Sequence, residues 1–374
     1  MNLALVGVGE TGSRIVDRII ETEAETGRSF SQGDALVCEI SQTATVELNA
    51  VPEERHVLIG DTHQQIIEHG VDGDPDLAAE VTRADLPEIR RAFDSLSIQE
   101  ADGVLVVTDL GSGTGSGAGS VLIEELQATH DEPVYALGVL PAESDGGGSA
   151  LNAARALRSI VPAAENMITF DHETWRKDED GEYAIDALAT RVVTLFAAGE
   201  FDSSTVAENA ADSSDLIRTF APGGLSSIGY ASTDVESDTP GLLARLLPWF
   251  GGGSDSEDDT TDAAKVKALV RQATGARLTM PCEVSSAERA LVVLSGPPSE
   301  LSRRGFESAR QWLEQEADTV EILAGDDPRE QSTTLEAVVL LSNVTDVPRI
   351  DALQSQAVDH KHAADETAAA DDAE

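Results

Sequence analysis

The sequence predicts an α/β fold, in which a doubly wound parallel sheet leads through a long central helix into a smaller α+β domain. Three observations predict it. Apolar strand-like runs alternate with helical stripes over about the first 200 residues, the order typical of a parallel sheet with helices on both faces. Two glycine-rich loops each follow a buried strand and open a helix. The chain of 374 residues is also too long for one ordinary core and fits two domains.

The expected strands of the first domain are short apolar runs bounded by turns. They span residues 3–8, 35–40, 56–60, 103–110, 134–140 and 167–171. Helices are expected after the first and fourth of these strands, near 84–96, and from about Ser149. We therefore place the first domain at 1–182. The central helix, with the loop and helix that follow it, takes 183–222.

The second domain is expected at 223–353. It opens at 224–232 and continues through a helix near 263–274, a strand at 290–296, a helix at 301–317 and strands at 320–325 and 335–343. The acidic, glycine-rich segment 251–262 is expected to be a mobile loop. From 354 to 374 the chain is rich in Ala, Asp and Glu, and we expect a disordered acidic tail, to which other proteins could bind.

The charge of the chain is extreme. Sixty-nine acidic residues stand against 25 basic ones, which leaves a formal net charge of −44. Self-repulsion on this scale destabilises a compact fold in dilute salt, but at molar salt the Debye length falls to about 3 Å and the repulsion is screened. The composition indicates a salty cytoplasm, as in extremely halophilic archaea. It argues against nucleic acid as a partner, because the basic patch that phosphates require is missing.

The sequence carries no sign of export or of a membrane anchor. Cys38 and Cys282 lack metal-site spacing and indicate a reducing compartment. The N-terminus runs straight into a glycine turn without the regions of a signal peptide, and no apolar run reaches 18 residues. We expect a cytoplasmic protein. The amphipathic segment 242–250 is expected to be core or a subunit contact, because its acidic surroundings repel anionic lipid.

The first glycine loop, GVGETG at 7–12, follows the first strand and opens the first helix. Its glycines let the backbone approach a phosphate, and the helix N-terminus supplies free N–H groups and a positive dipole. The pattern G-x-G-x-x-G alone is a weak signal. It fits an NAD-dependent dehydrogenase, for which Glu39 lies near the place of the ribose acid, and it fits a plain strand–helix turn.

The second glycine loop, LGSGTGSG at 110–117, discriminates better between these functions. Four glycines alternate with Ser and Thr, which offers a run of backbone N–H groups and hydroxyls to an anion. The loop has no Walker lysine, so a P-loop NTPase is excluded. A plain turn is a poor explanation for so many glycines in one loop.

At this loop the chain resembles the tubulin/FtsZ superfamily. GSGTGSG is similar to that family's G-G-G-T-G-[ST]-G, with Ser112 in place of the second glycine, and its hydroxyl could face a phosphate. The segments GVDGDP (70–75), FDHETWR (170–176) and DSSDLIRTF (212–220) also fall where the family has motifs, most closely in its CetZ branch. The motifs cover residues 1–232, and beyond them only the order of strands and helices agrees.

The resemblance implies a GTP or GDP site with Mg²⁺ and no separate metal site built from protein side chains. Under the phosphates it places the residues of the two glycine loops, which are Gly9, Glu10, Thr11, Gly12, Ser13, Arg14, Gly111, Ser112, Gly113, Thr114, Gly115 and Ser116. Segment 70–75 would sense the γ-phosphate. At the ribose it places Asp145, or Glu143 if the register shifts by two.

The resemblance also suggests residues for the base. His172 stands where the family has an Asn that contacts the nucleotide. Asp186 in the long helix is the best candidate for guanine, because a carboxylate can accept from both N1–H and N2–H, which adenine does not offer. Thr190, one turn further, is a weaker candidate. The alternative roles are a strand cap for His172 and a solvated helix position for Asp186.

Asp212 and Asp215 carry the expected catalytic role. The resemblance places them in the loop and helix that reach the γ-phosphate of the next subunit and polarise the attacking water. They are three residues apart, so on a helix both point the same way. FtsZ has an Asn two residues before the first acid, where this chain has Ala210, with Asn209 one position away. The alternative is an acidic helix start favoured by the helix dipole.

The expected function is therefore a GTPase completed by head-to-tail stacking of identical subunits. Such non-closing contacts build filaments, and the CetZ branch is associated with cell shape and motility. Two alternatives remain at this point. One is a nucleotide-holding structural protein of the same fold that does not hydrolyse GTP, given Ser112, His172 and Ala210. The other, the dehydrogenase, leaves the second glycine loop and the DSSD motif without a function.

Overall fold

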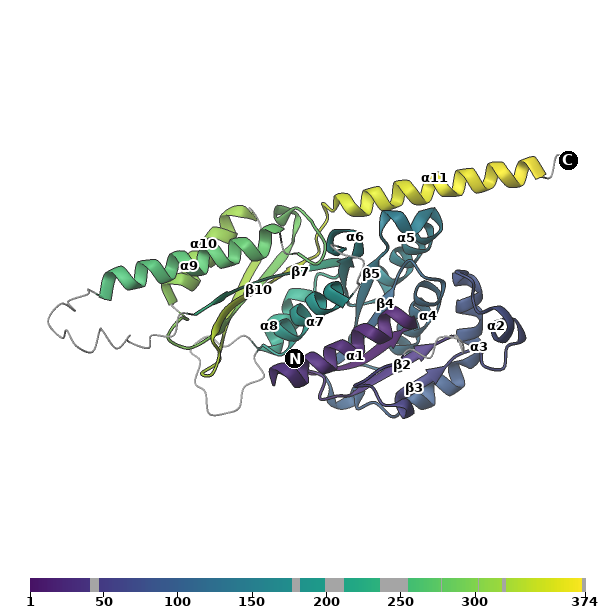
Figure 1. Cartoon of the computed structure of the whole chain (residues 1–374), viewed down its shortest axis with the longest axis horizontal. Coiled ribbons are helices and arrows are strands. Elements are labelled where there is room, and N and C mark those ends of the chain that lie inside the picture. The colour runs from purple at the N-terminus through teal and green to yellow at the C-terminus, as the bar shows by residue number, and fades with distance from the viewer. Residues whose placement is uncertain are drawn as a thin grey trace.

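A computed structural model gives the fold of the chain (Figure 1). It describes residues 1–40, 47–176, 182–198, 212–235, 255–276, 278–301, 303–317 and 321–371, and the side chains of 255–262, 276 and 368–371 are excluded. Segment 242–250, Asn209 and Ala210 lie outside the described residues. Within them, no helix is long and apolar enough to cross a bilayer.

The described strands form one sheet in the order β3-β2-β1-β4-β5-β6-β7-β10-β8-β9. Their bounds are β1 Leu3–Val8, β2 Ala35–Glu39, β3 His56–Leu58, β4 Gly103–Asp109, β5 Val134–Leu140, β6 Asn166–Asp171, β7 Leu225–Asp234, β8 Arg289–Gly296, β9 Glu321–Pro328 and β10 Thr334–Ser342. From β3 to β6 all neighbours are parallel. These strands are continuous apolar runs because both faces of a parallel sheet are covered.

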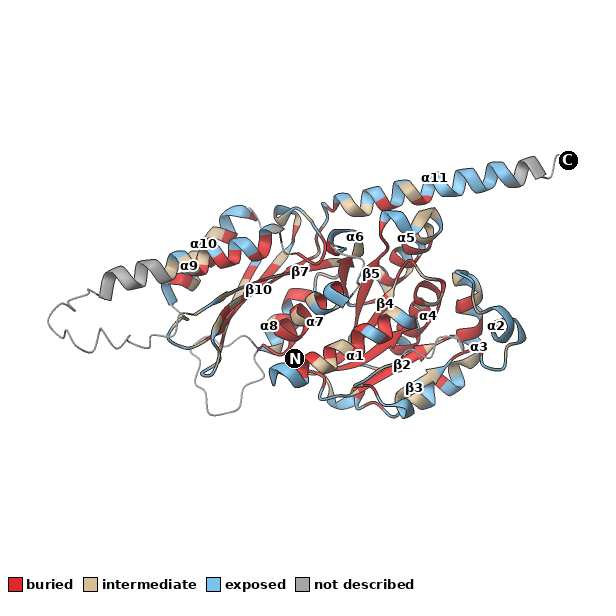
Figure 2. Cartoon of the chain, in the orientation of Figure 1, coloured by how far each residue is buried: buried red, intermediate tan, exposed pale blue. Residues whose placement is uncertain are grey.

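Helices cover both faces of the sheet, as Figure 2 shows by the buried strands between them. Their bounds are α1 Gly9–Thr26, α2 Gln64–His69, α3 Pro75–Phe93, α4 Gly113–Thr129, α5 Gly146–Ala163, α6 His172–Trp175, α7 Glu182–Phe196, α8 Ser213–Phe220, α9 Asp255–Ala276, α10 Arg303–Glu316 and α11 Pro348–Asp371. One apolar core lies under α1, α7 and α8, and the other lies under α3, α4, α5 and α9. The predicted doubly wound α/β class is confirmed.

The two halves of the sheet meet at a short joint. Strands β6 and β7 are parallel neighbours over only two residue pairs, Met167 with Leu225 and Ile168 with Ser226. Beyond the joint, β7, β10 and β8 are antiparallel, and β9 runs parallel to β8. The sheet therefore passes from the first half into the second without a break, and the domain boundaries at 182, 222 and 353 stay predictions.

Three segments differ from expectation. Helix α3 begins at Pro75 rather than near residue 84, because the Asp74 carboxylate accepts hydrogen bonds from the N–H groups of Asp76 and Leu77 and Pro75 fits the first helical turn. The loop expected at 251–262 is helical from Asp255, where acidic residues suit a helix N-terminus.

The expected disordered tail is the third difference. Residues 354–371 continue helix α11, which lies along α5 and extends beyond it (Figure 1). Leu353 and Ala357 are buried, so the start of this segment has an apolar contact that its composition did not reveal. The prediction of disorder is wrong as far as Asp371.

Candidate functional site

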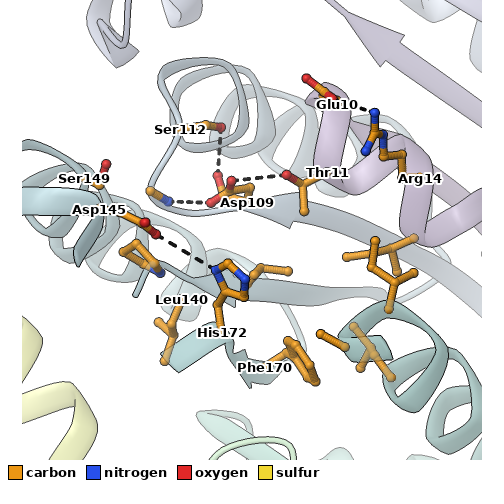
Figure 3. Close-up of a pocket in the computed structure, with 17 residues that line it drawn as sticks. Glu10, Thr11, Arg14, Asp109, Ser112, Leu140, Asp145, Ser149, Phe170 and His172 are labelled. Atoms are coloured by element: carbon orange, nitrogen blue, oxygen red, sulfur yellow. Dashed lines mark hydrogen bonds and ion pairs between the residues drawn. The ribbon is translucent and has the colours of Figure 1, made fainter. Parts of the chain in front are cut away.

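A cavity of about 360 Å³ opens where strands β1, β4, β5 and β6 end (Figure 3). It is lined by Glu10, Thr11, Arg14, Ile15, Asp109, Gly111, Ser112, Val139, Leu140, Pro141, Asp145, Ser149, Phe170, His172, Ala184, Ile185 and Leu188. The carboxyl ends of parallel strands meet at one edge of a sheet, which is where ligands of open α/β folds bind. The first turns of α1 and α5 and the N-cap residue of α4, Ser112, reach this cavity.

The first glycine loop lies at the mouth of the cavity. Gly9 has φ +72°, which favours glycine, and starts α1. Glu10, Thr11 and Arg14 line the cavity, and Arg14 and Glu10 form an ion pair of 2.9 Å. Ser13, by contrast, is buried behind the helix and donates a hydrogen bond to Glu39 Oε1 at 2.7 Å.

The second glycine loop reaches the cavity with Gly111 and Ser112. Ser112 caps α4, and its Oγ accepts a hydrogen bond from the Gly115 N–H at 2.9 Å. The expectation that this hydroxyl could face a phosphate therefore competes with its role as a helix cap.

The later residues of this loop do not line the cavity. Gly113 and Gly115 have protein neighbours where a side chain would be, because a Cβ on Gly113 would lie 2.6 Å from the carbonyl carbon of Gly73 and one on Gly115 would overlap the Asp109 carbonyl oxygen. Thr114 lies beside Gly9, so the two glycine loops are in contact. Ser116 Oγ donates to Ser112 O at 2.5 Å within the helix.

Asp109, which sequence reasoning missed, holds the two glycine loops together. Its carboxylate accepts hydrogen bonds from the Gly111 N–H at 2.8 Å and from Thr11 Oγ1 at 3.3 Å. Burial raises the pKa of this carboxyl, and the Gly111 N–H opposes that rise. Its only signal in the sequence is its place as the last residue of a strand before a glycine loop.

Asn152, for which no role was predicted, joins segment 70–75 to the second loop. Its Nδ2 donates to Gly73 O at 3.0 Å and to Gly111 O at 3.3 Å. The segment expected to sense a γ-phosphate therefore lies directly beside the second glycine loop.

Comparison with known proteins identifies this arrangement. Residues 2–179 match the Tubulin/FtsZ family, GTPase domain, and residues 181–359 match the Tubulin-like CetZ, C-terminal domain. The tubulin-like protein CetZ3 of Haloferax volcanii is 44 % identical over 365 residues, which are 96 % of this chain and 92 % of that protein. The chain belongs to the tubulin-like CetZ family.

Two solved structures of CetZ proteins agree with this fold. The GDP-bound monomer of CetZ1 from Haloferax volcanii has a TM-score of 0.81 at 36 % identity, over 96 % of this chain and all of that one. The GTPγS-bound protofilament of CetZ2 from the same organism has a TM-score of 0.82 at 30 % identity, over 98 % of this chain and all of that one. The predicted resemblance is confirmed, and the dehydrogenase alternative fails. Glu39, its candidate ribose acid, binds Ser13 and does not line the cavity.

Of the two ribose candidates in this CetZ chain, only Asp145 lines the cavity. Its carboxylate accepts from the Ala142 N–H at 2.8 Å and lies 4.0 Å from His172 Nδ1, which also lines the cavity. Glu143 is exposed, and its N–H donates to Glu173 Oε2 at 2.9 Å. Which acid contacts a ribose stays a prediction.

Neither Asp186 nor Thr190 lines the cavity. The Asp186 carboxylate accepts from Arg18 Nε at 2.6 Å and lines an adjoining open hollow of about 800 Å³, which shares Glu10, Arg14 and Ile185 with the cavity. Thr190 Oγ1 donates to the Asp186 carbonyl of its own helix at 2.8 Å. The predicted guanine acceptor is thus near the cavity but already bound to an arginine.

Asp212 and Asp215 are not among the residues that line the cavity. They form a capping box at the start of α8, in which Asp212 Oδ1 accepts from the Asp215 N–H at 3.0 Å. The helix-start alternative therefore describes their contacts within one subunit, and the catalytic role would require a neighbour. The described residues hold no group of three His, Cys, Asp or Glu that could bind a metal ion.

Proposed function

We propose that this chain binds GTP or GDP in the cavity, polymerises head to tail and hydrolyses GTP at the junction between subunits, as a cytoskeletal protein in the control of cell shape. The observation that carries the proposal is the convergence of three helix N-termini, those of α1, α4 and α5, on one cavity. Each presents the positive end of a helix dipole, and α1 and α5 begin without a side-chain cap on their first-turn N–H groups, an arrangement that suits a chain of phosphates.

The charge of the cavity explains why Mg²⁺ would accompany the nucleotide. Glu10, Asp109 and Asp145 line it, and Arg14, the only arginine among the described residues that line it, is already paired with Glu10. Bare polyphosphate would be repelled by these carboxylates. Mg²⁺ keeps several waters and binds phosphates with one or two carboxylates, so it needs no protein cage.

The far end of the cavity suits a base. Val139, Phe170, Ala184 and Leu188 make it apolar, and its volume lies in the range of small-molecule sites, roughly 300–1,000 Å³. Ile185 belongs to both this cavity and the hollow that holds Asp186. Guanine recognition by Asp186 would require this carboxylate to exchange Arg18 for the N1–H and N2–H groups of the base.

The separation of Asp212 and Asp215 from the cavity of their own chain supports hydrolysis in trans. The CetZ2 protofilament shows that a relative with the same fold stacks with a GTP analogue bound. In such a stack the cavity edge of one subunit would meet α8 of the next, and Asp212 and Asp215 would orient the attacking water. A filament whose junctions each contain one nucleotide would then couple assembly to turnover.

The deciding experiment measures GTP turnover per subunit against protein concentration in molar salt. We expect the rate to rise with concentration, because isolated subunits lack the second half of the site. ATP should bind poorly in the same assay. Turnover that does not depend on concentration would refute hydrolysis in trans, and co-purified NAD(H) would refute the site itself.

A second candidate function is a nucleotide-holding filament protein without turnover. The capping box of Asp212 and Asp215 favours it, since it gives both acids a role within one subunit. This candidate predicts bound GTP, assembly with concentration, and no phosphate release at any concentration.

A further inference from the structure

Helix α11 faces the rest of the molecule with one stripe of side chains. Arg349, Leu353, Gln356 and His360 are spaced by four, three and four residues, so they lie on one face of the helix. Leu353 is fully buried, whereas the surrounding positions Asp351, Ala352 and Ser355 are exposed. In Figure 2 the buried and half-buried positions lie in the first part of α11, and residues 358–367, His360 included, are exposed.

Arg349 connects the ends of two neighbouring strands. Its Nε donates to Asp171 Oδ1 at 2.9 Å, and its Nη2 donates to the Pro141 carbonyl. The Asp171 side chain is 1 % exposed and its other oxygen accepts from the N–H and Oγ1 of Thr174, so this carboxylate has partners on both sides. Pro141 follows β5 and Asp171 ends β6, so one guanidinium holds both strand ends.

Gln356 and His360 continue this contact towards the start of α5. Gln356 Nε2 donates to the Glu143 carbonyl at 3.0 Å. His360 lies over Gly147, where a Cβ would be 2.5 Å from His360 Cβ. Gly147 does not have positive φ, and its neighbours Gly146 and Gly148 have no atom closer than 3.9 Å to such a Cβ. The missing side chain at Gly147 is therefore explained by the room that α11 needs.

The segments held by α11 form one wall of the nucleotide cavity. Pro141, Asp145 and Ser149 line it from the loop after β5 and the start of α5, and Phe170 and His172 line it from the end of β6. None of the described side chains of α11 lines the cavity. We infer that α11 is an intramolecular brace, in which Arg349, Gln356 and His360 position this wall and couple nucleotide affinity to the docking of the C-terminal helix. The inference rests on the proposed nucleotide function of the cavity.

Coupling of this kind is reciprocal. If docking of α11 favours nucleotide binding, bound nucleotide favours the docked helix by the same factor. Loss of the brace should weaken GTP binding by about fivefold or more, the lower end of typical coupling between sites. Turnover at saturating GTP should change much less, because no brace residue reaches the reacting phosphate.

A size exchange between Gly147 and His360 tests the brace. Gly147→Ala adds a Cβ that displaces α11, and His360→Gly removes the atoms it would strike. We expect Gly147→Ala to weaken GTP binding about fivefold, and the double variant Gly147→Ala/His360→Gly to recover the affinity of His360→Gly alone. His362→Gly, on the exposed part of the same helix, controls for the effect of glycine on the helix.

The same variants are compared without nucleotide by hydrogen exchange. Amides of 142–149 should exchange faster in Gly147→Ala and return to the slower rate in the double variant, with the other strands unchanged. This second measurement separates two failures. If the unmodified protein binds no GTP, the proposed function fails. The hydrogen-exchange pattern then tests by itself whether α11 positions the cavity wall. A double variant as impaired as Gly147→Ala, or unchanged exchange in Gly147→Ala, would overturn the brace.

Arg349→Lys supplies an independent variant. Lysine keeps the charge but lacks the planar fork that reaches both Asp171 and Pro141. We expect weaker GTP binding and faster exchange in 142–149, whereas Arg310→Lys, at an exposed ion pair on α10, should change neither. Equal behaviour of the two lysine variants would contradict a positioning role for Arg349.

Discussion

The cavity edge and helix α8 use their acidic residues in opposite ways. At the cavity, Asp109 and Asp145 accept hydrogen bonds from backbone N–H groups of the loops that shape the site. On α8, Asp212 and Asp215 form a capping box with each other at the helix start, and neither lines the cavity. The acids of the cavity therefore shape its loops, whereas the two acids of α8 lie outside the cavity and cap a helix. Under the proposed function, a single subunit would therefore lack part of the site that it shares with its neighbour.

The largest expected effect is on GTP turnover, when the acid Asp212 at the start of α8 is replaced. Asn is as good a helix cap as Asp but cannot act as a base, so Asp212→Asn should leave stability and GTP affinity near those of the unmodified protein. If Asp212 acts on the next subunit, turnover should fall by roughly 10²–10⁴. Phosphate release, GTP affinity and thermal melting are measured side by side. Full activity of Asp212→Asn would show that the residue is only a cap, whereas Asp212→Ala should in either case lose about 1 kcal/mol of stability.

The second effect concerns a buried arginine that connects the end of helix α1, in the first half of the sheet, with strands β8 and β10 in the second half. Arg28, which follows α1, is buried, and its guanidinium lies 2.5 Å from Glu336 Oε2 on β10 and 2.6 Å from Ser295 Oγ on β8. Arg28→Met would remove the charged partner of the half-buried Glu336 carboxylate, which keeps a hydrogen bond from the Tyr230 hydroxyl, and should cost up to about 3–5 kcal/mol. Denaturant unfolding measures this cost. As a control, Arg310→Met at an exposed ion pair should cost less than about 1 kcal/mol. An equal cost for the two variants would mean that the contact between the two halves does not depend on Arg28.

A third, smaller effect compares a glycine at the cavity edge, Gly115, with a glycine in α9, Gly275, by the stability cost of adding a side chain. A Cβ on Gly115 would overlap the Asp109 carbonyl at the cavity edge, while one on Gly275 in α9 would meet nothing within 4 Å. Gly115→Ala should therefore cost about 1–3 kcal/mol and weaken GTP binding. Gly275→Ala should be neutral or stabilise the protein by up to about 1 kcal/mol. Melting curves of both variants are the measurement, and a harmless Gly115→Ala would mean that the loop can shift to accept a side chain.

The sequence could predict the parallel sheet and the cavity edge because both depend on local patterns. Apolar runs such as 103–109 are buried on both faces, and each glycine loop lies between a strand and its helix. Contacts between distant segments carry no such signal. Arg18 and Asp186 are 168 residues apart, so the ion pair that occupies the expected guanine acceptor was not foreseeable.

Helix α11 shows the same limit. Its composition resembles a disordered tail, and only its contact with Gly147, Pro141 and Asp171 reveals an ordered helix. Asp109 was missed for a different reason. An acidic residue at a strand end is common in a chain with 69 acids, and its role follows only from its hydrogen bonds to both glycine loops.

Changing the salt concentration tests whether repulsion between the acidic residues destabilises both halves of the sheet together. With a net charge of −44, repulsion should grow as the Debye length rises from about 3 Å in molar salt to 10 Å at 0.1 M. We expect the melting temperature to fall by more than about 4 °C, which corresponds to over 1 kcal/mol in a chain of this size. Hydrogen exchange should accelerate on both sides of the joint between β6 and β7. A melting temperature independent of salt would refute the halophilic interpretation.

The smallest expected effect is a pH dependence at Asp326 in β9, in the half without the cavity. Burial raises the pKa of this carboxyl from 3.8 to about 6. Its protonated form is therefore favoured in the folded state, so it stabilises the fold at low pH and this contribution is lost as pH rises through about 6. Lowering the pH from 7 to 5 in molar salt should raise the melting temperature of the unmodified protein slightly.

Asp326→Asn should remove that part of the rise, which is no more than about 1 kcal/mol because the side chain is partly solvated. Glu39 and Asp109, whose pKa values burial also raises, keep their contributions in both proteins, so the difference between the two curves isolates Asp326. Identical pH profiles would show that the β9 carboxyl titrates as in water and that the second half of the sheet is more open at this edge than the cavity half.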